Sequence, residues 1–275
     1  MALDPIEPAA FEFILQVERF YTSLISAADA GSAPNSEPNL GGMMLYTGEL
    51  DGEGRALLVA GNIAGAAALA ATAELAAQKQ SIRDGVADFL VSSLDEALRI
   101  LKNQIRKRET AAVCLSKALE AVEQEMLERG VLPDLLRPTE ELSPQSPFVL
   151  LGARQIPPPT PVKNPVLLTW RVAAAPAQWL PKLDAIALDC LRPDARPAAP
   201  AARRWLRLAP RYLGRLAQGV RLLRCNREFA AAFTEEVRNR VERGEISVPV
   251  EIQLSSQGRC DRHSFLPRGD SAGGS

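Results

Sequence analysis

The segment from Leu57 to Leu136 alternates short apolar runs with longer helical patterns, and this alternation limits the folds open to the chain. An apolar run at Ala56–Ala60 predicts a strand, and the glycines after it, Gly61 and Gly65, predict a turn into an alanine-rich helix. Two further pairs of strand and helix follow. Strands that alternate with helices favour a parallel sheet covered on both faces. We therefore predict a small three-layer α/β unit that resembles nucleotide-binding domains.

The ends of the expected helices carry clear signals. The first helix should run from about Ala64 to Arg83, and the second should begin after Ser92 or Ser93, whose hydroxyl can accept from a first-turn amide. Acids follow that cap and bases precede the helix end, so both ends complement the helix dipole. The third helix should end at Gly130, in a left-handed cap. Strands are expected at residues 43–46, 86–91 and 111–115.

Length and composition place the chain among ordinary globular proteins. Its 275 residues suit one large domain or two small ones, and an apolar fraction of 47% is enough for a core. No apolar run reaches the roughly 18–20 residues that a membrane span needs. The N-terminus carries acids and no early basic cluster, which is unlike a signal peptide. We expect a cytoplasmic protein without a transmembrane segment.

Charge divides the chain into two unlike halves. Residues 1–150 hold 12 basic and 22 acidic residues, whereas residues 151–275 hold 20 basic and 11 acidic residues. Two modules of opposite sign can dock on each other or on different partners. Docking within the chain is the simpler interpretation, and an acidic protein partner or self-association is the alternative.

Composition along the chain predicts five segments. They are an amphipathic helix and linker at 1–42, the α/β unit at 43–137, a proline-rich linker at 138–165, a basic and mainly helical part at 166–254, and a flexible tail at 255–275. Eight prolines fall between Pro138 and Pro165. In the basic part we expect strands at 166–172 and 248–254, a helix at 178–190, and helix over 201–243 with a break near Pro210.

Cysteine and histidine usage excludes several site classes. The four cysteines form no CxxC pair, and His263 is the only histidine, so neither a disulfide framework nor a zinc site is expected. We predict no metal and reduced thiols, as in a bacterial-type cytoplasm. Cys114 lies in an apolar strand and is expected to be an inert core thiol. Cys190 and Cys225 lie near arginines that could lower a thiol pKa, although helix packing is the simpler role for each.

Other candidate catalytic groups are few. No serine-histidine-aspartate triad can be assembled around the single histidine, and neither a G-x-S-x-G nor a Walker motif is present. Two groups of carboxylates, Asp95-Glu96 and Glu123-Glu125-Glu128, fit solvated helix faces better than acid/base pairs. No catalytic residue can be assigned from the sequence.

Several short motifs occur in the order found in one enzyme family. They are Gly61–Gly65 with Leu69-Ala70-Ala71-Thr72, then Ser93–Leu98, Ala112–Leu115 and Arg129–Asp134, with weaker matches at Phe233–Val237 and Gly244–Val250. On these motifs the chain resembles urocanate hydratase (urocanase). The resemblance implies a Rossmann-like domain that binds NAD, whose nicotinamide acts as an electrophile while water is added to urocanate.

The chain also departs from the family pattern. Its turn has fewer glycines, which a phosphate-cradling turn needs for close backbone approach. Between Leu69 and Leu98 the sequence shows no second strand ending in a ribose-binding acid, and the family's active-site cysteine motif has no match. The chain is also shorter than full family members. These departures predict a degenerate, shortened relative.

If the turn still binds NAD, the contacts implied by the resemblance are Gly61, Asn62 and Gly65. The alternative for the glycines is structural, because glycine after a strand also permits close packing of a helix. Either role requires the turn to follow a strand.

A second candidate surface is rich in arginine. No acid lies between Ala195 and Arg227, and four arginines repeat every four residues: Arg203, Arg207, Arg211 and Arg215. They would share one side of a helix if Pro210 only kinks it. Such a stripe suits phosphates, an anionic membrane surface or an acidic protein face, although a solvated helix face is the simpler interpretation.

We therefore predict a urocanase-like protein without hydratase activity, acting as an accessory or interaction protein linked to histidine degradation. One alternative is an active NAD-dependent hydro-lyase of the urocanase type. Another is a binder of anionic surfaces or nucleic acid through the arginine stripe, although no clear nucleic-acid motif is present.

Overall fold

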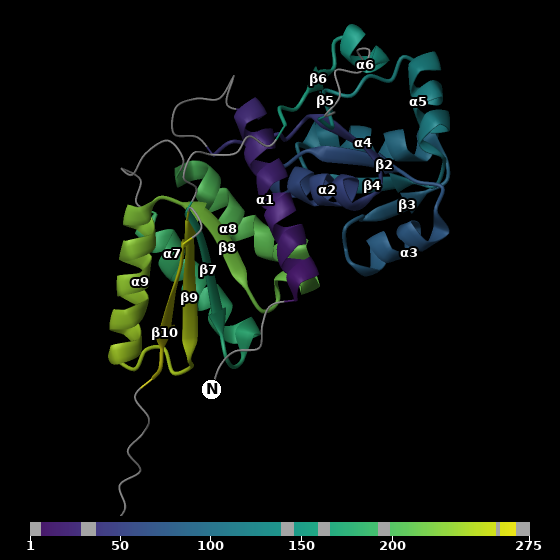
Figure 1. Cartoon of the computed structure of the whole chain (residues 1–275). Coiled ribbons are helices and arrows are strands. Elements are labelled where there is room, and N and C mark those ends of the chain that lie inside the picture. The colour runs from purple at the N-terminus through teal and green to yellow at the C-terminus, as the bar shows by residue number, and fades with distance from the viewer. Residues whose placement is uncertain are drawn as a thin grey trace, which may run out of the picture. The chain divides into compact units, whose positions relative to one another are not determined.

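The computed structural model describes residues 7–28, 37–138, 146–158, 166–191, 199–256 and 259–267, which belong to two units. One unit comprises residues 11–161 and 211–215, and the other comprises residues 1–10, 162–210 and 216–275. Each unit has its own sheet (Figure 1). The two sheets differ in kind, since one is parallel and the other antiparallel.

The first unit is built on a six-stranded sheet in the order β3-β4-β2-β1-β5-β6, in which every neighbouring pair is parallel. This confirms the predicted α/β fold. Its elements are α1 (Pro8–Ala28), β1 (Met44–Glu49), α2 (Gly52–Ala64), β2 (Ala67–Ala71), α3 (Leu75–Arg83), β3 (Phe89–Val91), α4 (Leu94–Lys107), β4 (Ala111–Leu115), α5 (Leu119–Glu128), β5 (Leu135–Leu136), α6 (Pro147–Leu150) and β6 (Arg154–Gln155).

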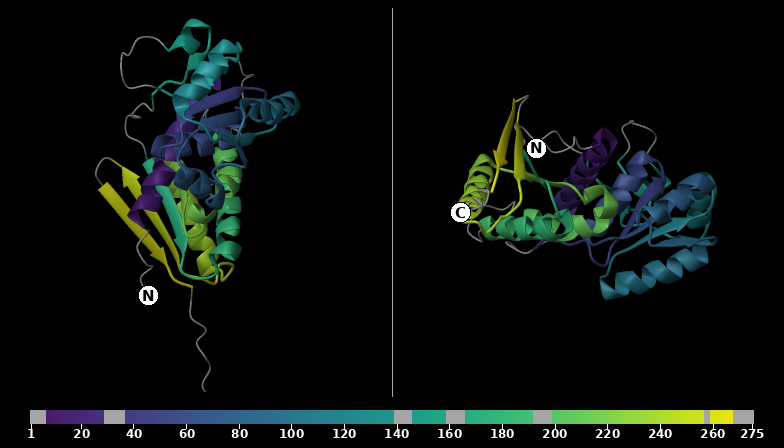
Figure 2. Two further views of the ribbon diagram at one scale, coloured as in Figure 1. Left: turned by 90° about the vertical axis from the view of Figure 1, so that its right-hand side faces the viewer. Right: turned by 90° about the horizontal axis from the view of Figure 1, so that it is seen from below.

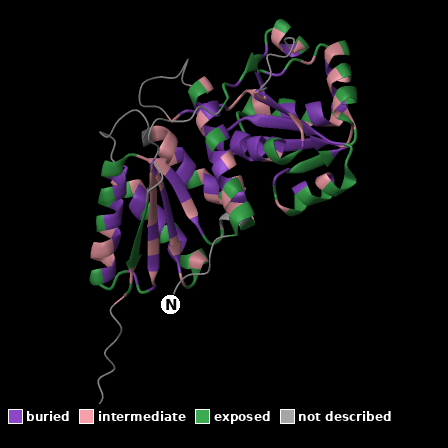
Figure 3. Ribbon diagram, viewed as in Figure 1, coloured by how far each residue is buried: buried purple, intermediate pink, exposed green. Residues whose placement is uncertain are grey.

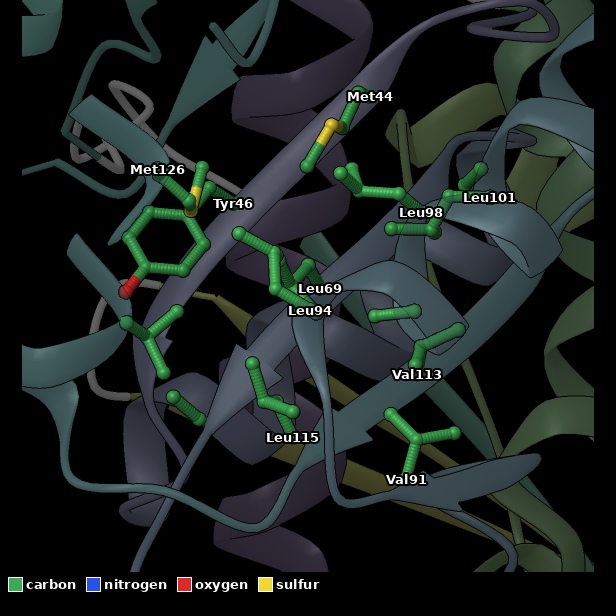
Figure 4. Packing of buried hydrophobic residues seen from close by; sticks show 14 of the residues in the cluster. Met44, Tyr46, Leu69, Val91, Leu94, Leu98, Leu101, Val113, Leu115 and Met126 are labelled. Carbon is green, nitrogen blue, oxygen red and sulfur yellow. The ribbon is translucent and has the colours of Figure 1, made fainter. Parts of the chain in front are cut away.

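Helices cover both faces of this sheet. One face packs on α4, α5 and α6, and its core includes Tyr46, Leu69 and Val113 from the strands with Leu98 and Met126 from the helices (Figure 4). The opposite face packs on α2. Figure 3 shows α2 and the central strands almost wholly buried.

The predicted strand at Ala56–Ala60 is wrong, because these residues lie inside α2. Every residue of α2 from Ala56 to Ala64 is buried. A helix that is buried on all sides has no polar face, so its sequence lacks the 3.6-residue periodicity that marks amphipathic helices. A short apolar run of this kind cannot be told from a buried strand by periodicity.

The predicted helix from Ala64 to Arg83 is also wrong, since it is interrupted by β2 at Ala67–Ala71. The sequence of β2 is Ala-Ala-Leu-Ala-Ala, and alanine has the highest intrinsic helix propensity. Pairing with β1 on one side and β4 on the other overrides that preference. The sequence was expected to lack a second strand after the first helix, but β2 is such a strand, so this expectation is wrong.

The remaining elements of this unit follow the sequence signals closely. Ser93 caps α4 and accepts from the Glu96 amide at 3.3 Å, as predicted. Gly130 has φ of +63° and follows α5 as the expected left-handed residue. The predicted amphipathic helix near the N-terminus is α1, and the strand at 43–46 is the start of β1.

The proline-rich segment contains regular structure. Within residues 138–165, α6 and β6 are formed, and β6 completes the parallel sheet beside β5. Phe148 of α6 is buried against Tyr46, with ring centroids 6.0 Å apart in an edge-to-face arrangement. The prediction of a plain linker is therefore wrong at 147–155. Residues 139–145 and 159–165 lie outside the described residues.

The second unit has an antiparallel sheet in the order β10-β9-β7-β8, and Figure 2 shows the β9–β10 pair from two further directions. Its elements are β7 (Val166–Val172), α7 (Pro176–Cys190), α8 (Ala199–Leu213) as far as Pro210, the 3-10 helix η2 (Gly214–Ala217) from residue 216, β8 (Arg221–Cys225), α9 (Arg227–Glu242), β9 (Val250–Ser256) and β10 (Arg259–Phe265). The strands expected at 166–172 and 248–254 are confirmed as β7 and β9, and the helix at 178–190 is confirmed as α7.

Two local predictions fail in this unit. The helix expected over 201–243 is divided by β8, which pairs with β7. The tail expected to be loose from Ser255 includes β10, which pairs with β9 along its whole length. β8 pairs with β7, which lies far away in the sequence, and β10, which pairs with β9, is mostly polar. Neither pairing therefore leaves a local pattern in the sequence. Residues 268–275 lie outside the described residues.

A buried ion pair links a helix of the second unit to its sheet. The Asp184 carboxylate of α7 accepts from Arg221 Nε at 2.8 Å and from Trp170 Nε1 at 3.2 Å. The two charged side chains are only 11% and 12% exposed. Burial raises the pKa of Asp184, against the opposing effects of Arg221 and Trp170. These contacts join α7 to both β7 and β8.

Replacing Asp184 with Asn should lower the free energy of unfolding by about 3 kcal/mol, because it removes the carboxylate that neutralises Arg221 in the interior. Chemical denaturation followed by tryptophan fluorescence would measure the loss. Asp189→Asn removes an exposed carboxylate of the same helix and should cost less than about 0.5 kcal/mol. Equal effects of the two substitutions would contradict a structural role for the pair.

Candidate functional site

In a parallel sheet of this kind, ligands bind outside the carboxyl ends of the strands, where neighbouring connections leave in opposite directions. Here that point lies between β1 and β5. The chain leaves β1 through α2 toward β2, and it leaves β5 through α6 toward β6 on the other side. The turn after β1 and the residue after β5 are therefore the first place to seek a site.

The turn after β1 is held by a hydrogen bond and a close backbone contact within its own residues. Asp51 is the N-cap of α2, and its carboxylate accepts from the Gly54 amide at 2.7 Å. A Cβ atom on Gly54 would lie 2.0 Å from the Glu49 carbonyl oxygen, so the strand end and the first helical turn are in tight contact. Only glycine fits at this position, and the reason is packing of the chain against itself.

The place between β1 and β5 where the connections leave in opposite directions is called the switch point. Arg137, directly after β5, joins the two sides of this point. Its guanidinium donates to both carboxylate oxygens of Asp51 at 3.0–3.1 Å and to Glu53 at 2.6 Å. Burial alone would lower the pKa of Arg137, but the hydrogen bonds to Asp51 and Glu53 raise it instead. Arg137 is thus held as a cation that neutralises two carboxylates of the α2 terminus.

This arrangement does not fit a dinucleotide. A helix N-terminus attracts phosphate because its first amides are unpaired and its dipole end is positive. At α2 the Asp51 carboxylate already occupies that position, Glu53 adds a second negative charge, and Arg137 is committed to both. A pyrophosphate placed here would meet two carboxylates.

The residues predicted to contact NAD lie elsewhere. Gly61 and Asn62 are in the last turns of α2, and Gly65 ends the helix with φ of +99°. They lead into the start of β2, which is the amino edge of the sheet, opposite the carboxyl ends. The predicted turn after a strand is therefore absent, and the proposed cofactor contacts lose their structural basis.

These residues have packing roles instead. A Cβ atom on Gly61 would lie 2.8 Å from Cδ2 of Leu45, so glycine lets α2 approach β1 closely. The Asn62 side chain accepts a hydrogen bond from the Thr110 hydroxyl. Gly65 donates its amide to Asn62 and Gly61 carbonyls. Leu45 and Thr110 give no local signal of these contacts in the sequence.

The end of β2 also differs from the expectation. Thr72 follows the strand directly and is buried, and its hydroxyl accepts from the Glu74 amide at 3.2 Å. Glu74 itself is exposed and precedes α3 without capping it. Glu74 is thus an acid near the carboxyl edge of the sheet, and the sequence pattern gives no sign of it because alanine-rich β2 resembles a helix.

A second polar feature of this edge is Tyr46 on β1. Its hydroxyl is buried and interacts with the Glu123 carboxylate, although outside normal hydrogen-bond geometry. Burial raises the pKa of the phenol well above its usual value, and the charge of Glu123 and its hydrogen-bonding interaction with the phenol raise it further, with smaller contributions from Glu49 and Glu120. Glu123, expected on a solvated helix face, is only partly exposed.

The arginine stripe lies on α8 and the 3-10 helix after it. Pro210 lies inside α8, which continues to Leu213, so Arg203, Arg207 and Arg211 share one helix. Arg215 follows in η2. Arg207, Arg211 and Arg215 are exposed, and Arg203 is partly exposed. The Arg211 guanidinium lies 5.3 Å from the centre of the Tyr212 ring.

The Cys114 and Cys225 thiols are made less acidic by burial. Burial raises the pKa of Cys114 to about 11, and Glu49 adds to this effect. Burial also raises the pKa of Cys225 to about 12, which is opposite to the lowering that nearby arginines could have caused. Among the described residues, no three His, Cys, Asp or Glu side chains are grouped closely enough to hold a metal ion. No described helix is long and apolar enough to cross a membrane.

Residues 21–145 match the family model for the urocanase Rossmann-like domain. This segment is therefore related to the urocanase Rossmann-like domain. The match lies within the first unit and includes β1 to β5, so the predicted urocanase relationship is confirmed for this domain. Domains of this family are generally associated with NAD.

Replacing Arg137 with Ala should lower the free energy of unfolding of the urocanase-like domain by about 1 kcal/mol, because Asp51 and Glu53 lose their counter-charge. The loss should shrink as salt is added, since the acids are about half exposed. Denaturant titrations at two salt concentrations would measure it. Arg99→Ala, which removes an exposed arginine from α4, should have a smaller effect with little salt dependence.

Replacing Tyr46 with Phe should leave the free energy of unfolding unchanged or raise it by about 1 kcal/mol, because the buried hydroxyl has no partner of normal geometry. Thermal denaturation would measure the change. Tyr46→Ala removes the ring that packs on Phe148 and should cost about 3 kcal/mol or more. A large loss in the Phe variant would show that the hydroxyl is satisfied in solution.

Proposed function

We propose that this urocanase-like protein has no hydratase activity and acts as an accessory or interaction protein linked to histidine degradation. The observation that supports this most directly is the closure of the switch point by Asp51, Glu53 and Arg137. In the family the electrophile of the reaction is the nicotinamide of NAD. A domain that fills the phosphate position with its own carboxylates retains the fold without the means to hold that electrophile.

The purified full chain should therefore carry no NAD and should not consume urocanate. Mass spectrometry of the small molecules released on denaturation tests the first point, and the loss of urocanate absorbance tests the second. An active urocanase purified in the same way provides the positive control. Stoichiometric NAD or turnover of urocanate would overturn the proposal in favour of an active hydro-lyase.

A charge-relieving variant makes the test sharper. Asp51→Asn with Glu53→Gln removes both negative charges from the N-terminus of α2 while keeping the size of the side chains. Calorimetric titration with NAD should show no binding to the wild type. Weak binding to this variant alone would show that the carboxylates exclude the nucleotide, whereas equal binding to both would contradict that explanation.

The arginine stripe supports a second candidate function, the binding of an anionic surface. Its basis is the continuity of α8 through Pro210 and the exposure of Arg207 and Arg211 on that helix. Binding to anionic vesicles or to nucleic acid should then collapse as salt rises. Arg207→Gln with Arg211→Gln should abolish it, and an unchanged affinity would exclude the stripe.

A further inference from the structure

Strand β3 forms one edge of the parallel sheet in the urocanase-like domain. It pairs with β4 alone, so its other side has no neighbouring strand among the described residues. The Val91 carbonyl accepts from the Ser116 amide at 2.8 Å, which directs the backbone of Val91 toward β4. Because successive residues of a strand direct their backbone groups to alternate sides, the N–H and C=O groups of Leu90 face the open edge. Such an edge is a template for pairing with another strand.

Apolar side chains gather at this edge. Phe89 and Leu90 of β3 are each 41% exposed. On α3, Ile82 is 42% exposed and Leu75 is 60% exposed. These four are half of the eight large apolar side chains that are exposed in the described part of the chain. Figure 3 shows α3 and β3 as mostly exposed elements. Single exposed apolar residues are common, whereas a group of this kind indicates an interaction surface.

The apolar side of α3 faces the same open edge. Leu75 and Ile82 are seven residues apart, which is close to two helical turns, so they share one side of the helix. Asp84 lies nine residues after Leu75, on the opposite side, where it pairs with Arg55 of α2 at 2.7 Å. The side with Leu75 and Ile82 therefore points away from α2 and toward the edge formed by β3.

Leu90 lies on the same face of the sheet as α3. Val91 packs in the hydrophobic cluster on the α4 face, so its neighbour Leu90 points to the opposite face. The chain crosses the sheet in one direction from β1 to β2 and from β2 to β3, and right-handed connections place α2 and α3 on one face. Leu90, Leu75 and Ile82 thus border the open edge on one face, and Phe89 borders it on the other.

This surface is complementary to itself. A two-fold axis perpendicular to the sheet and passing through Leu90 places that residue opposite its own copy, in an antiparallel pair. Both backbone groups of Leu90 that face the edge are then used, because a hydrogen-bonded antiparallel pair exchanges two N–H···O=C bonds. The same axis brings α3 beside its copy on one face, with Leu75 of each helix near Ile82 of the other.

The charges around the edge also suit a second copy. Between residues 74 and 90, the exposed charged side chains are two acids and two bases, namely Glu74, Asp88, Lys79 and Arg83. Two copies of a surface without net charge do not repel each other, and a strongly acidic or strongly basic partner finds no complementary charge here.

We propose that two copies of this chain associate through β3 and α3, with the β3 strands paired antiparallel across a two-fold axis. β3 contains neither a charged residue nor a proline, two features that keep edge strands from pairing. Because β3 has only three residues, the interface is small and the dimer should be weak, with a Kd on the order of 10 µM. The inference goes beyond the proposed function, because pairing at this edge involves neither NAD nor urocanate.

Sedimentation velocity of the full chain at concentrations from about 1 to 100 µM, which bracket a Kd of this order, tests the proposal. The wild type should shift from monomer to dimer as its concentration rises. Leu90→Lys places a charge at the centre of the paired edge and should raise the Kd at least about tenfold. A wild type that stays monomeric over the whole range would overturn the proposal.

Leu132→Lys is the matched control, because Leu132 is also 41% exposed and lies outside α3 and β3. It should leave the dimer unchanged. Circular dichroism of both variants shows whether each retains the fold. Equal weakening by the two substitutions would place the contact elsewhere and overturn the assignment to β3.

A cross-linking test examines the symmetry directly. Cα atoms of a hydrogen-bonded antiparallel pair are about 5.5 Å apart, a separation that a disulfide can span. Leu90→Cys should therefore form an intermolecular disulfide on mild oxidation, to a greater extent than Leu132→Cys or the wild type. No excess of cross-linked dimer would overturn the two-fold pairing. Retention of NAD by the protein would overturn the proposed function and leave these outcomes unchanged, so the two proposals fail separately.

Discussion

The fold of the urocanase-like domain depends on the burial of one helix, α2, against the central strands of the parallel sheet. Gly61 removes the side chain that would meet Leu45, and the small residues of β2 let the helix lie close to the sheet. Such close contact replaces the larger side chains that usually fill the space between helix and sheet. Both termini of α2 are then fixed by local groups, with Gly65 closing the last turn and Asp51 capping the first.

The same helix determines the electrostatics of the candidate site. Its N-terminus lies where a Rossmann-like domain ordinarily holds phosphate, because the amides there are unpaired and the helix dipole is positive. In this chain the amide of Gly54 is used by Asp51, and Arg137 neutralises Asp51 and Glu53 together. The edge that attracts an anion in dinucleotide-binding domains therefore carries acidic side chains. The Rossmann-like fold is retained, while the N-terminus of α2 is occupied by the chain's own charged side chains.

Particular elements show how far local pattern predicts this structure. The capped, amphipathic helix α4 and the buried strand β4 were predictable, because Ser93, the charged ends and the apolar side of α4 each act locally. Between Ala56 and Ala71, the sequence pattern predicts a strand followed by a helix, whereas the structure has a helix followed by a strand. The helix is apolar on every side and the strand is rich in alanine, so periodicity and propensity both pointed the wrong way. Placing NAD contacts at Gly61 and Gly65 followed from that error.

The sequence by itself determined the α/β class, the relationship to urocanases and the uneven charge of the two halves, because composition and ordered motifs are properties of the chain. Only the tertiary structure decided which edge of the sheet each glycine and acid occupies. Asp51 and Arg137 are far apart in the chain, and so are Tyr46 and Glu123, yet parallel strand pairing and helix packing bring each pair together. A ligand-binding edge is made by such long-range contacts, and no local pattern encodes them.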